Sequence, residues 1–276
     1  VPLLTGYLAA YGFLLNLALF IYFIDQIGKI LRPSIVLQYV ALIGRKVIRS
    51  VYPRLLDESH SAQPGQTTII EGEARTIVND EDGVLLAFDL NGLVILAERS
   101  NCLIELMPEV GDFVAAGDPL FRIFQGGENI SEESLRNSVA LGAERTMEQD
   151  PMFAFRIIVD IASKALSPAI NDPTTAVLAI DQLHHLLRDV GRRYLAEGRE
   201  SDRGGQVRLL YRTPNWEDFV QLAVTEVRQY GRDSVQVMRR LRAMLESLIA
   251  TLPDRRAAVL RNGIEFAGDF VQASVS

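Results

Sequence analysis

The sequence predicts a membrane-anchored α+β protein with a transmembrane helix, a small barrel-sandwich-like β module and a C-terminal α-helical domain. Three observations predict it. Residues 1–24 form an uncharged apolar run, residues 66–124 hold short apolar segments broken by turn residues, and residues 128–276 carry repeated helical patterns. With 48% hydrophobic and 23% charged residues in 276, the composition is that of a globular protein rather than a disordered or collagen-like one.

Composition also limits the chemistry. The formal net charge of -7 gives no global signature of nucleic-acid binding. The single cysteine, Cys102, excludes an intramolecular disulfide framework and a multi-cysteine zinc site. Two of the three histidines, His184 and His185, are adjacent and would point about 100° apart on a helix. We therefore expect no metal, no cofactor and no nucleic-acid partner.

The first element is the apolar run, which predicts a transmembrane helix over residues 1–24. A helix of this length crosses the roughly 30 Å core of a bilayer. A signal peptide would instead start with positive charge and end in a small-residue cleavage site. The run begins at Val1 without a preceding methionine. We therefore expect this helix to be the last of several spans, with the N-terminus missing, and the lipid bilayer to be its surroundings.

Within this span, small residues and one amide suggest contacts with other helices. Gly6 and Gly12 permit close helix approach. Asn16 lies near the middle of the span and needs a hydrogen-bond partner in a dry environment. The pattern predicts either plain helix packing or a pore-lining position, and partner helices from the missing segment or from a homo-oligomer.

Residues 25–58 predict a juxtamembrane, basic, amphipathic helix. Apolar residues recur at helical spacing over 34–51, and Pro33 suits the first helical position. Such a helix would either lie along the membrane surface or form a stalk between protomers. Residues 25–54 contain one acid, Asp25, against six basic residues: Lys29, Arg32, Arg45, Lys46, Arg49 and Arg54. The positive-inside rule then predicts that this side, and the C-terminal region with it, is cytoplasmic.

Residues 59–65 have the composition of a linker, and a β module is predicted over 66–124. Strands are expected at 67–72, 83–89, 93–98, 101–107, 112–117 and 120–124. The stretch P-x-x-G-D-F-V-x-x-G-D-P-L over 108–120 resembles the hairpin of biotinyl- and lipoyl-type domains. Because residues 47–163 contain no lysine, nothing there could carry such a cofactor. We interpret the module as a structural or docking unit, with a generic hairpin as the alternative.

The helical domain is predicted over residues 128–276. Helices are expected at 132–148, 151–166, 173–195, 216–230, 233–250 and 254–270, with a strand at 206–212 and a polar loop at 198–205. Asp150 and Asp172 each precede a proline, which is typical of an N-cap followed by the first helical residue. Asn215 is expected to cap the helix that begins at Trp216.

The most distinctive motif lies in this domain. It comprises R-T-M-E-Q-D-P at 145–151, Arg156, V-D-I-A at 159–162 and A-L-S-P-A-I-N-D-P-T-T-A at 165–176. This pattern resembles the DUF2254 family of predicted bacterial membrane proteins, with Ala169 where glycine would be expected. The resemblance implies several N-terminal spans, a soluble C-terminal region and a bacterial inner-membrane location. It implies no particular chemistry.

A candidate site lies at the turn before residue 173. Hydrogen-bonding groups gather there on Ser167, Asn171, Asp172 and Thr174, and charges on the preceding segments could pair with it. These charges are Arg145, Asp150, Arg156 and Asp160. A helix N-terminus can bind an anion, but an aspartate cap fills the same donors. The turn is therefore either a ligand or ion site or a capped, salt-bridged structural junction.

Two functions are compatible with this organisation. The first is a homo-oligomeric channel or transport-related protein, because the layout resembles that of small-conductance mechanosensitive channels. The second is a membrane-anchored scaffold or sensor that binds a protein partner or a small anion. The sequence contains no recognisable catalytic motif, which leaves an enzyme uncertain and disfavoured.

Overall fold

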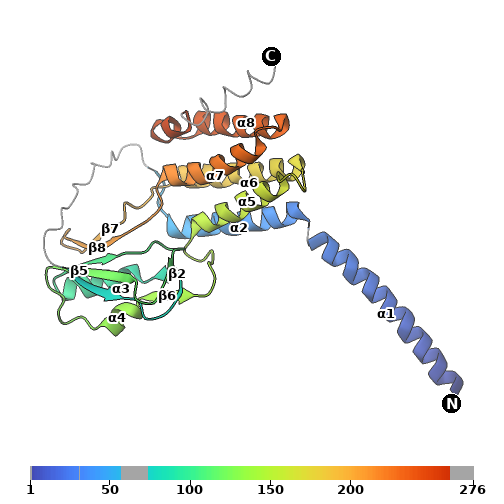
Figure 1. The fold of residues 1–276 in the computed structure, drawn as a ribbon, viewed down its shortest axis with the longest axis horizontal. Helices are drawn as coiled ribbons and strands as arrows, with labels where there is room; N and C mark the ends of the chain where they lie inside the picture. Colours follow the sequence, from blue (N-terminus) through green and yellow to red (C-terminus); the bar gives the residue numbers. More distant parts are fainter. Residues whose placement is uncertain (1, 31, 57–73, 262–276) are drawn as a thin grey trace.

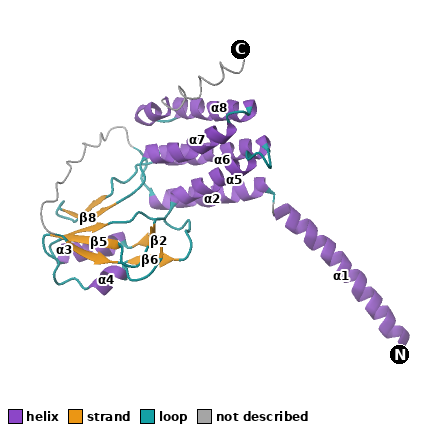
Figure 2. Ribbon diagram, in the orientation of Figure 1, coloured by secondary structure: helices purple, strands orange, loops and turns teal. Residues whose placement is uncertain are grey.

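The computed structural model describes residues 2–30, 32–56 and 74–261. It contains a helical bundle, a β module beside it, and one long helix, α1, that projects away from both (Figure 1). Figure 2 shows that the bundle is built from helices alone, whereas the β module mixes strands with short helices. The mixed α+β class expected from the sequence is confirmed.

Helix α1 spans Pro2–Ile30. Its segment Leu3–Gln26 is long and apolar enough to cross a membrane, with a mean hydropathy of 1.9. No part of this segment is buried by the rest of the described chain. The large apolar side chains along α1 are therefore exposed, as expected for a helix whose surroundings are lipid or other helices.

Helix α2 spans Pro33–Val51 and packs inside the bundle. Its buried face, which includes Leu37, Val40 and Ile48, belongs to the bundle core and contacts α5 and α6. Gly44 allows the closest approach, since a Cβ atom there would lie 2.6 Å from the Ala154 Cβ. We expected the apolar face of this helix to contact either the membrane surface or another protomer. In the structure this face instead packs against the chain's own helices α5 and α6.

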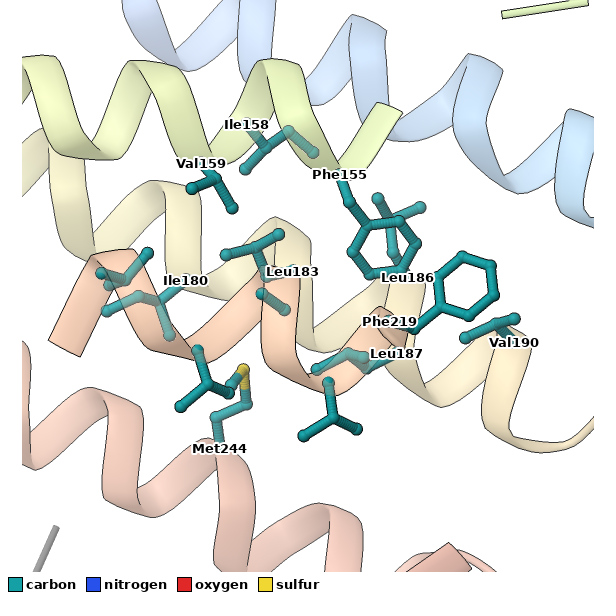
Figure 3. Packing of buried hydrophobic residues seen from close by; sticks show 14 of the residues in the cluster. Phe155, Ile158, Val159, Ile180, Leu183, Leu186, Leu187, Val190, Phe219 and Met244 are labelled. Atoms are coloured by element: carbon teal, nitrogen blue, oxygen red, sulfur yellow. The ribbon is translucent and has the colours of Figure 1, made fainter. Parts of the chain in front are cut away.

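The rest of the bundle comprises α5 (Pro151–Ala165), α6 (Pro173–Gly191), α7 (Trp216–Gly231) and α8 (Val235–Thr251). Figure 3 shows Phe155 and Ile158 of α5 packed against Leu183 and Leu186 of α6. Phe219 of α7 completes this layer, with its ring centroid 5.2 Å from that of Phe155. The expected helices at 151–166, 216–230 and 233–250 are confirmed within two residues, whereas α6 ends four residues before 195. Residues 254–261 are helical, and 262–270 lie outside the described residues.

The β module contains two sheets. One has the order β1-β5-β3-β8-β7 and the other β4-β2-β6, and the described residues form no closed barrel. Their strands are β1 (Arg75–Val78), β2 (Gly83–Phe88), β3 (Leu103–Leu106), β4 (Phe113–Val114), β5 (Pro119–Phe124), β6 (Val139–Gly142), β7 (Arg199–Ser201) and β8 (Val207–Tyr211). The linker at 59–65 and the strand expected at 67–72 lie outside the described residues.

The glycine-rich motif at 108–120 is not a hairpin. β4 pairs with β2 in the small sheet, whereas β5 pairs with β1 and β3 in the large one. The motif therefore carries the chain from one sheet to the other. Its glycines do adopt the expected positive φ, at 97° for Gly111 and 93° for Gly117.

Two further expectations were wrong because tertiary context decided between helix and strand. Residues 93–98, expected as a strand, lie in helix α3 (Leu90–Arg99), which is capped by Asp89 and buries Leu93 and Ala97. Short apolar runs are ambiguous between these two structures. The helix expected at 132–148 stops after α4 (Glu132–Arg136), because residues 139–142 pair with β2 instead.

The expected division into a β module at 66–124 and a helical domain at 128–276 is also wrong. β6 lies between α4 and α5 in the sequence, and β7 and β8 lie between α6 and α7. All three belong to the sheets. The chain thus passes repeatedly between the bundle and the β module, and β7 lies in the expected loop at 198–205.

Candidate functional site

The charged residues of the sequence motif are distributed along helix α5. At its start, Asp150 is the N-cap: its Oδ1 accepts from the Phe153 N–H at 3.0 Å. Arg145 holds the same carboxylate from the other side, with Nε on Oδ2 and Nη2 at 3.1 Å from Oδ1. Asp150 is buried, and its two oxygens are both bonded. This pair fixes the start of the helix.

Arg156 and Asp160 lie one turn apart on the same helix and face α7. The Arg156 guanidinium binds Asp160 and also reaches Glu226 of α7, with Nη2 at 2.8 Å from Oε2. These bonds to Glu226 and Asp160 raise the pKa of Arg156 further above its ordinary value, and they lower that of Glu226. The network clamps α5 to α7. The sequence suggested that Arg156 and Asp160 could pair with the turn before residue 173. In the structure they contact each other and Glu226 instead.

The turn between α5 and α6 is closed by its own residues. The Asp172 carboxylate accepts from the Thr175 N–H at 3.1 Å and from the Thr175 hydroxyl at 2.5 Å. Ser167 donates its hydroxyl to the Lys164 carbonyl at 2.7 Å, and Asn171 adopts a left-handed φ of 48°. Thr174 is exposed. Asp172 therefore caps α6 and fills a donor that an anion at this helix start would otherwise use.

These groups do not form one site. Helix α5 has 15 residues, so its ends lie about 22 Å apart at 1.5 Å per residue. Arg145 and Asp150 are at one end, the turn of Asp172 is at the other, and Arg156 and Asp160 lie between them. The motif thus makes contacts in three separate places: at the start of α5, between α5 and α7, and at the turn before α6.

The membrane helix residues singled out by the sequence are uncovered. Apart from the neighbouring residues and backbone of α1 itself, nothing in the described chain lies within 4 Å of a Cβ atom added at Gly6 or Gly12. Asn16 is exposed on the same helix. The described residues therefore provide no partner helix for α1.

The structure adds a feature that the sequence did not indicate, a cleft between the bundle and the β module. Its cavity has a volume of about 270 Å³. The bundle contributes the last turn of α2, with Tyr52 just beyond it, and the start of α5. The β module contributes Phe88, Glu109 and Tyr211. The volume lies just below the usual range of about 300 to 1,000 Å³ for small-molecule sites, and the walls mix apolar and polar groups as such sites do.

Burial changes the ionisation of three groups in this cleft. Desolvation raises the pKa of Tyr52 to about 12, and a hydrogen bond with Thr213 opposes the shift. Desolvation and the nearby Glu200 also raise the pKa of Tyr211. The pKa of the Glu109 carboxyl is raised mainly by burial, against the attraction of Arg212. Perturbed groups gathered in a cavity are a physical marker of a functional site.

The two modules meet at the edge of this cleft through the turn at Glu109–Asp112. The Asp112 N–H donates to the Glu109 carbonyl at 2.9 Å, and the Asp112 carboxylate accepts from the Glu109 N–H at 2.9 Å. At the centre of the turn Gly111 lies against Arg145 and Asp150. The turn thus docks onto the N-terminus of α5 and places Glu109 at the cavity.

Sequence reasoning missed Glu109, Tyr52 and Tyr211 as site residues. They come from three segments far apart in the chain. Glu109 lies inside the glycine-rich motif at 108–120, but at one of its unspecified positions, and Tyr52 and Tyr211 belong to no motif. The one local signal was the glycine at 111, which predicted a tight turn but not the surface on which it docks.

Comparison with known proteins supports the membrane assignment. Residues 1–247 match the family described as "Predicted membrane protein (DUF2254)". Uncharacterised proteins of Mycobacterium bovis and Mycobacterium tuberculosis are 27% identical over 253 residues, which is 88% of this chain and 48% of each relative. The chain therefore spans about half the length of the curated relatives it matches. No solved structure matches.

The family match and the candidate span together identify a predicted membrane protein, in which one helix of spanning length leads into a bundle joined to a β module. The chain belongs to the DUF2254 family.

Proposed function

We propose that the chain forms a membrane anchor and cytoplasmic domain of a sensor, in which a small ligand in the cleft acts on the membrane helix through α2. One observation carries this proposal: the cavity is lined both by the end of α2 and by the β module. Helix α2 also follows α1 directly in the chain. A ligand that contacts both modules favours one arrangement of them, and α2 transmits that preference.

Helix α2 is suited to this role because it packs tightly against two neighbouring helices. Its buried face contacts α5 and α6, and Gly44 brings it close to Ala154. Arg45 and Arg49 both bind Asp189 of α6, at 3.2 Å each. A displacement at the end near Tyr52 would therefore move α2 as a unit, together with the end that adjoins α1.

The same proposal includes location. We place the folded domain on the cytoplasmic side of a bacterial inner membrane. The basic residues of 25–54 support this orientation through the positive-inside rule. Lys29 and Arg32 are the ones nearest to the candidate span.

A cavity-filling substitution tests the coupling without knowledge of the ligand. An environment-sensitive fluorophore is placed on Gln26→Cys, at the end of the span, in the chain held in lipid nanodiscs. The native Cys102 is buried and should label poorly. We expect Ala196→Phe, which adds a ring to the cleft wall, to shift the emission of this label.

The matched control is Ala140→Phe, which adds the same ring at an exposed position of β6 and should leave the emission unchanged. A thermal melt verifies that both variants are folded, and Leu90→Trp serves as a second filling variant. Unchanged emission in folded Ala196→Phe and Leu90→Trp would contradict coupling between cleft and membrane helix.

A second candidate function is a homo-oligomeric channel or transport-related protein, favoured by the uncovered residues of α1. Asn16 needs a hydrogen-bond partner within the bilayer, and Gly6 and Gly12 permit close helix approach. Mass photometry in nanodiscs discriminates the two functions. A ring of several copies favours the channel, whereas a monomer or simple dimer favours the sensor.

A further inference from the structure

We infer that the cleft binds a small organic cation, an amine with an aromatic or aliphatic body, whose charged nitrogen contacts the Glu109 carboxylate. The inference rests on the proposed function, because it names the ligand class for the same cleft. Three observations support it: Glu109 accepts no hydrogen bond on its carboxylate from the described residues, the walls are largely apolar and aromatic, and the nearby charges are mostly negative.

Glu109 is the carboxylate in the cleft that remains available. Its side chain is 25% exposed, and the closest cationic group in the described chain is the Arg212 Nη2, 3.9 Å from Oε2. No described residue donates a hydrogen bond to this carboxylate. Its backbone is nevertheless fixed, because the turn bonds to Asp112 hold it on both sides. Glu109 thus presents acceptor atoms from a rigid position.

Asp150 lines the same cavity but cannot take this role. Arg145 and the Phe153 N–H already occupy its two oxygens. Breaking that arrangement would uncap α5 and leave a buried charge, which is costly. A ligand cation therefore meets Glu109 rather than Asp150.

The walls suit an organic body better than an inorganic ion. The rings of Phe88 and Tyr211 lie with centroids 5.2 Å apart, and Val51, Leu90 and Pro214 add apolar surface. Aromatic faces attract cations through their quadrupole, most strongly when the contact is desolvated. An amine with a hydrocarbon body would use both parts of the cavity.

The electrostatic surroundings oppose an anion. Three other carboxylates, those of Asp112, Asp150 and Asp218, act on the Glu109 carboxyl, and Arg212 opposes them. Arg145 neutralises Asp150, so four carboxylates, including Glu109 itself, stand against two guanidinium groups. An anionic ligand would be repelled by this excess. A neutral ligand would lack the charge-assisted hydrogen bond that a carboxylate offers to an ammonium group.

Three probes of similar shape and different charge test the inference: phenethylamine, 2-phenylethanol and phenylacetate. Isothermal titration calorimetry is carried out on the chain in nanodiscs of neutral phosphatidylcholine, so that anionic lipid does not bind the amine. We expect phenethylamine to bind at least tenfold more tightly than the alcohol or the acid. Glu109→Gln should weaken amine binding at least tenfold and leave alcohol binding unchanged.

Matched variants keep the test specific. Glu246→Gln makes the same change of charge on an exposed residue of α8 and should leave amine binding unchanged. Glu109→Asp keeps the charge and should retain more amine affinity than Glu109→Gln. A thermal melt of each variant confirms folding. If Glu109→Gln is unfolded, the amine affinities of Glu109→Asp and Ala196→Phe are compared with that of the wild type instead.

The outcomes separate the ligand class from the proposed function. Suppose that the alcohol binds as tightly as the amine and that Ala196→Phe abolishes binding of both. The cleft is then a ligand site, but its ligand is not specifically a cation. If Glu109→Gln binds the amine like the wild type, the role of Glu109 is wrong. Absence of phenethylamine binding at millimolar concentration would overturn the inference. The coupling between the cleft and the membrane helix would still be tested separately, by the emission of the label on Gln26→Cys.

Discussion

Gly111 lies so close to Asp150 that a Cβ atom on the glycine would stand 2.7 Å from the Asp150 Oδ2. The same Cβ would stand 2.5 Å from the Arg145 Nε. The turn of the β module is thus seated against the ion pair that begins α5. This contact joins the two modules beside the cleft.

The contact predicts that Gly111→Ala destabilises the fold more than Gly117→Ala. Both glycines have positive φ, so each substitution costs about 1 to 2 kcal/mol of backbone strain. Gly117 has nothing within 4 Å of its Cβ position. Gly111→Ala should cost about 1 to 3 kcal/mol more, the usual penalty of overpacking. Urea unfolding of both variants measures the difference, and equal midpoints would show that the turn is not tightly docked.

The Asp172 cap predicts a graded mutational series. Asp172→Ala should lower the free energy of unfolding by about 1 kcal/mol, and at most about 2, because the Thr175 N–H loses its acceptor. Asp172→Asn and Asp172→Ser should largely restore stability, since both side chains cap helices. Thermal melts check the order. An alanine variant as stable as the wild type would contradict capping and favour a ligand role for the turn.

The same cap predicts a pH dependence. Hydrogen bonds from the Thr175 hydroxyl and N–H lower the pKa of Asp172 from its ordinary value of 3.8. The ionised carboxylate therefore contributes stability above pH 3.8, and the contribution is lost as pH falls through the lower folded-state pKa. The stability difference between wild type and Asp172→Ala should shrink below about pH 4. A difference that stays constant down to pH 2 would argue against an ionised cap.

His184 predicts a loss of stability between pH 7 and pH 5.5. Burial lowers the pKa of His184 from 6.5, Arg240, His185 and Arg188 lower it further, and Asp181 opposes them. The Arg240 Nη2 lies 3.2 Å from Nδ1, and Nε2 is buried without a partner in the described structure. Below pH 6.5 the unfolded chain binds the proton first, so stability falls, by less than about 1.4 kcal/mol per pH unit.

The matched variants are His184→Gln and His185→Gln, since His185 is exposed beside it. The first should flatten the stability profile between pH 7 and pH 5.5, and the second should leave it like the wild type. Chemical denaturation at four pH values provides the measurement. If both variants behave alike, the dependence arises elsewhere.

The proposed orientation predicts the result of a reporter fusion. Green fluorescent protein fused after Ser276 should fluoresce, whereas alkaline phosphatase at the same point should be inactive, because the six basic residues after the span favour the cytoplasm. Replacing Lys29 and Arg32 by glutamine should weaken this preference. An active phosphatase fusion with the native sequence would reverse the orientation.

Local signals in the sequence predicted local structure well. Asp150, Asp172 and Asn215 cap the helices expected of them, since an N-cap depends on residues within one turn. The strand β6 was missed because its partner lies in β2, far away in the chain. The cleft was missed for the same reason. Glu109 gains its role only when a distant helix terminus comes to face the turn that carries it.

The parallel pairing of β3 with β8 has a consequence for how the chain acquires its structure. Ile104 pairs with Leu209, so β3 lacks this neighbour until α5 and α6 have been synthesised. Until then one edge of β3 presents unpaired backbone groups, a template for wrong partners. Such distant pairings slow folding. We therefore expect translation pauses or chaperone binding between residues 125 and 205 to affect the yield of native protein more than similar events after α7.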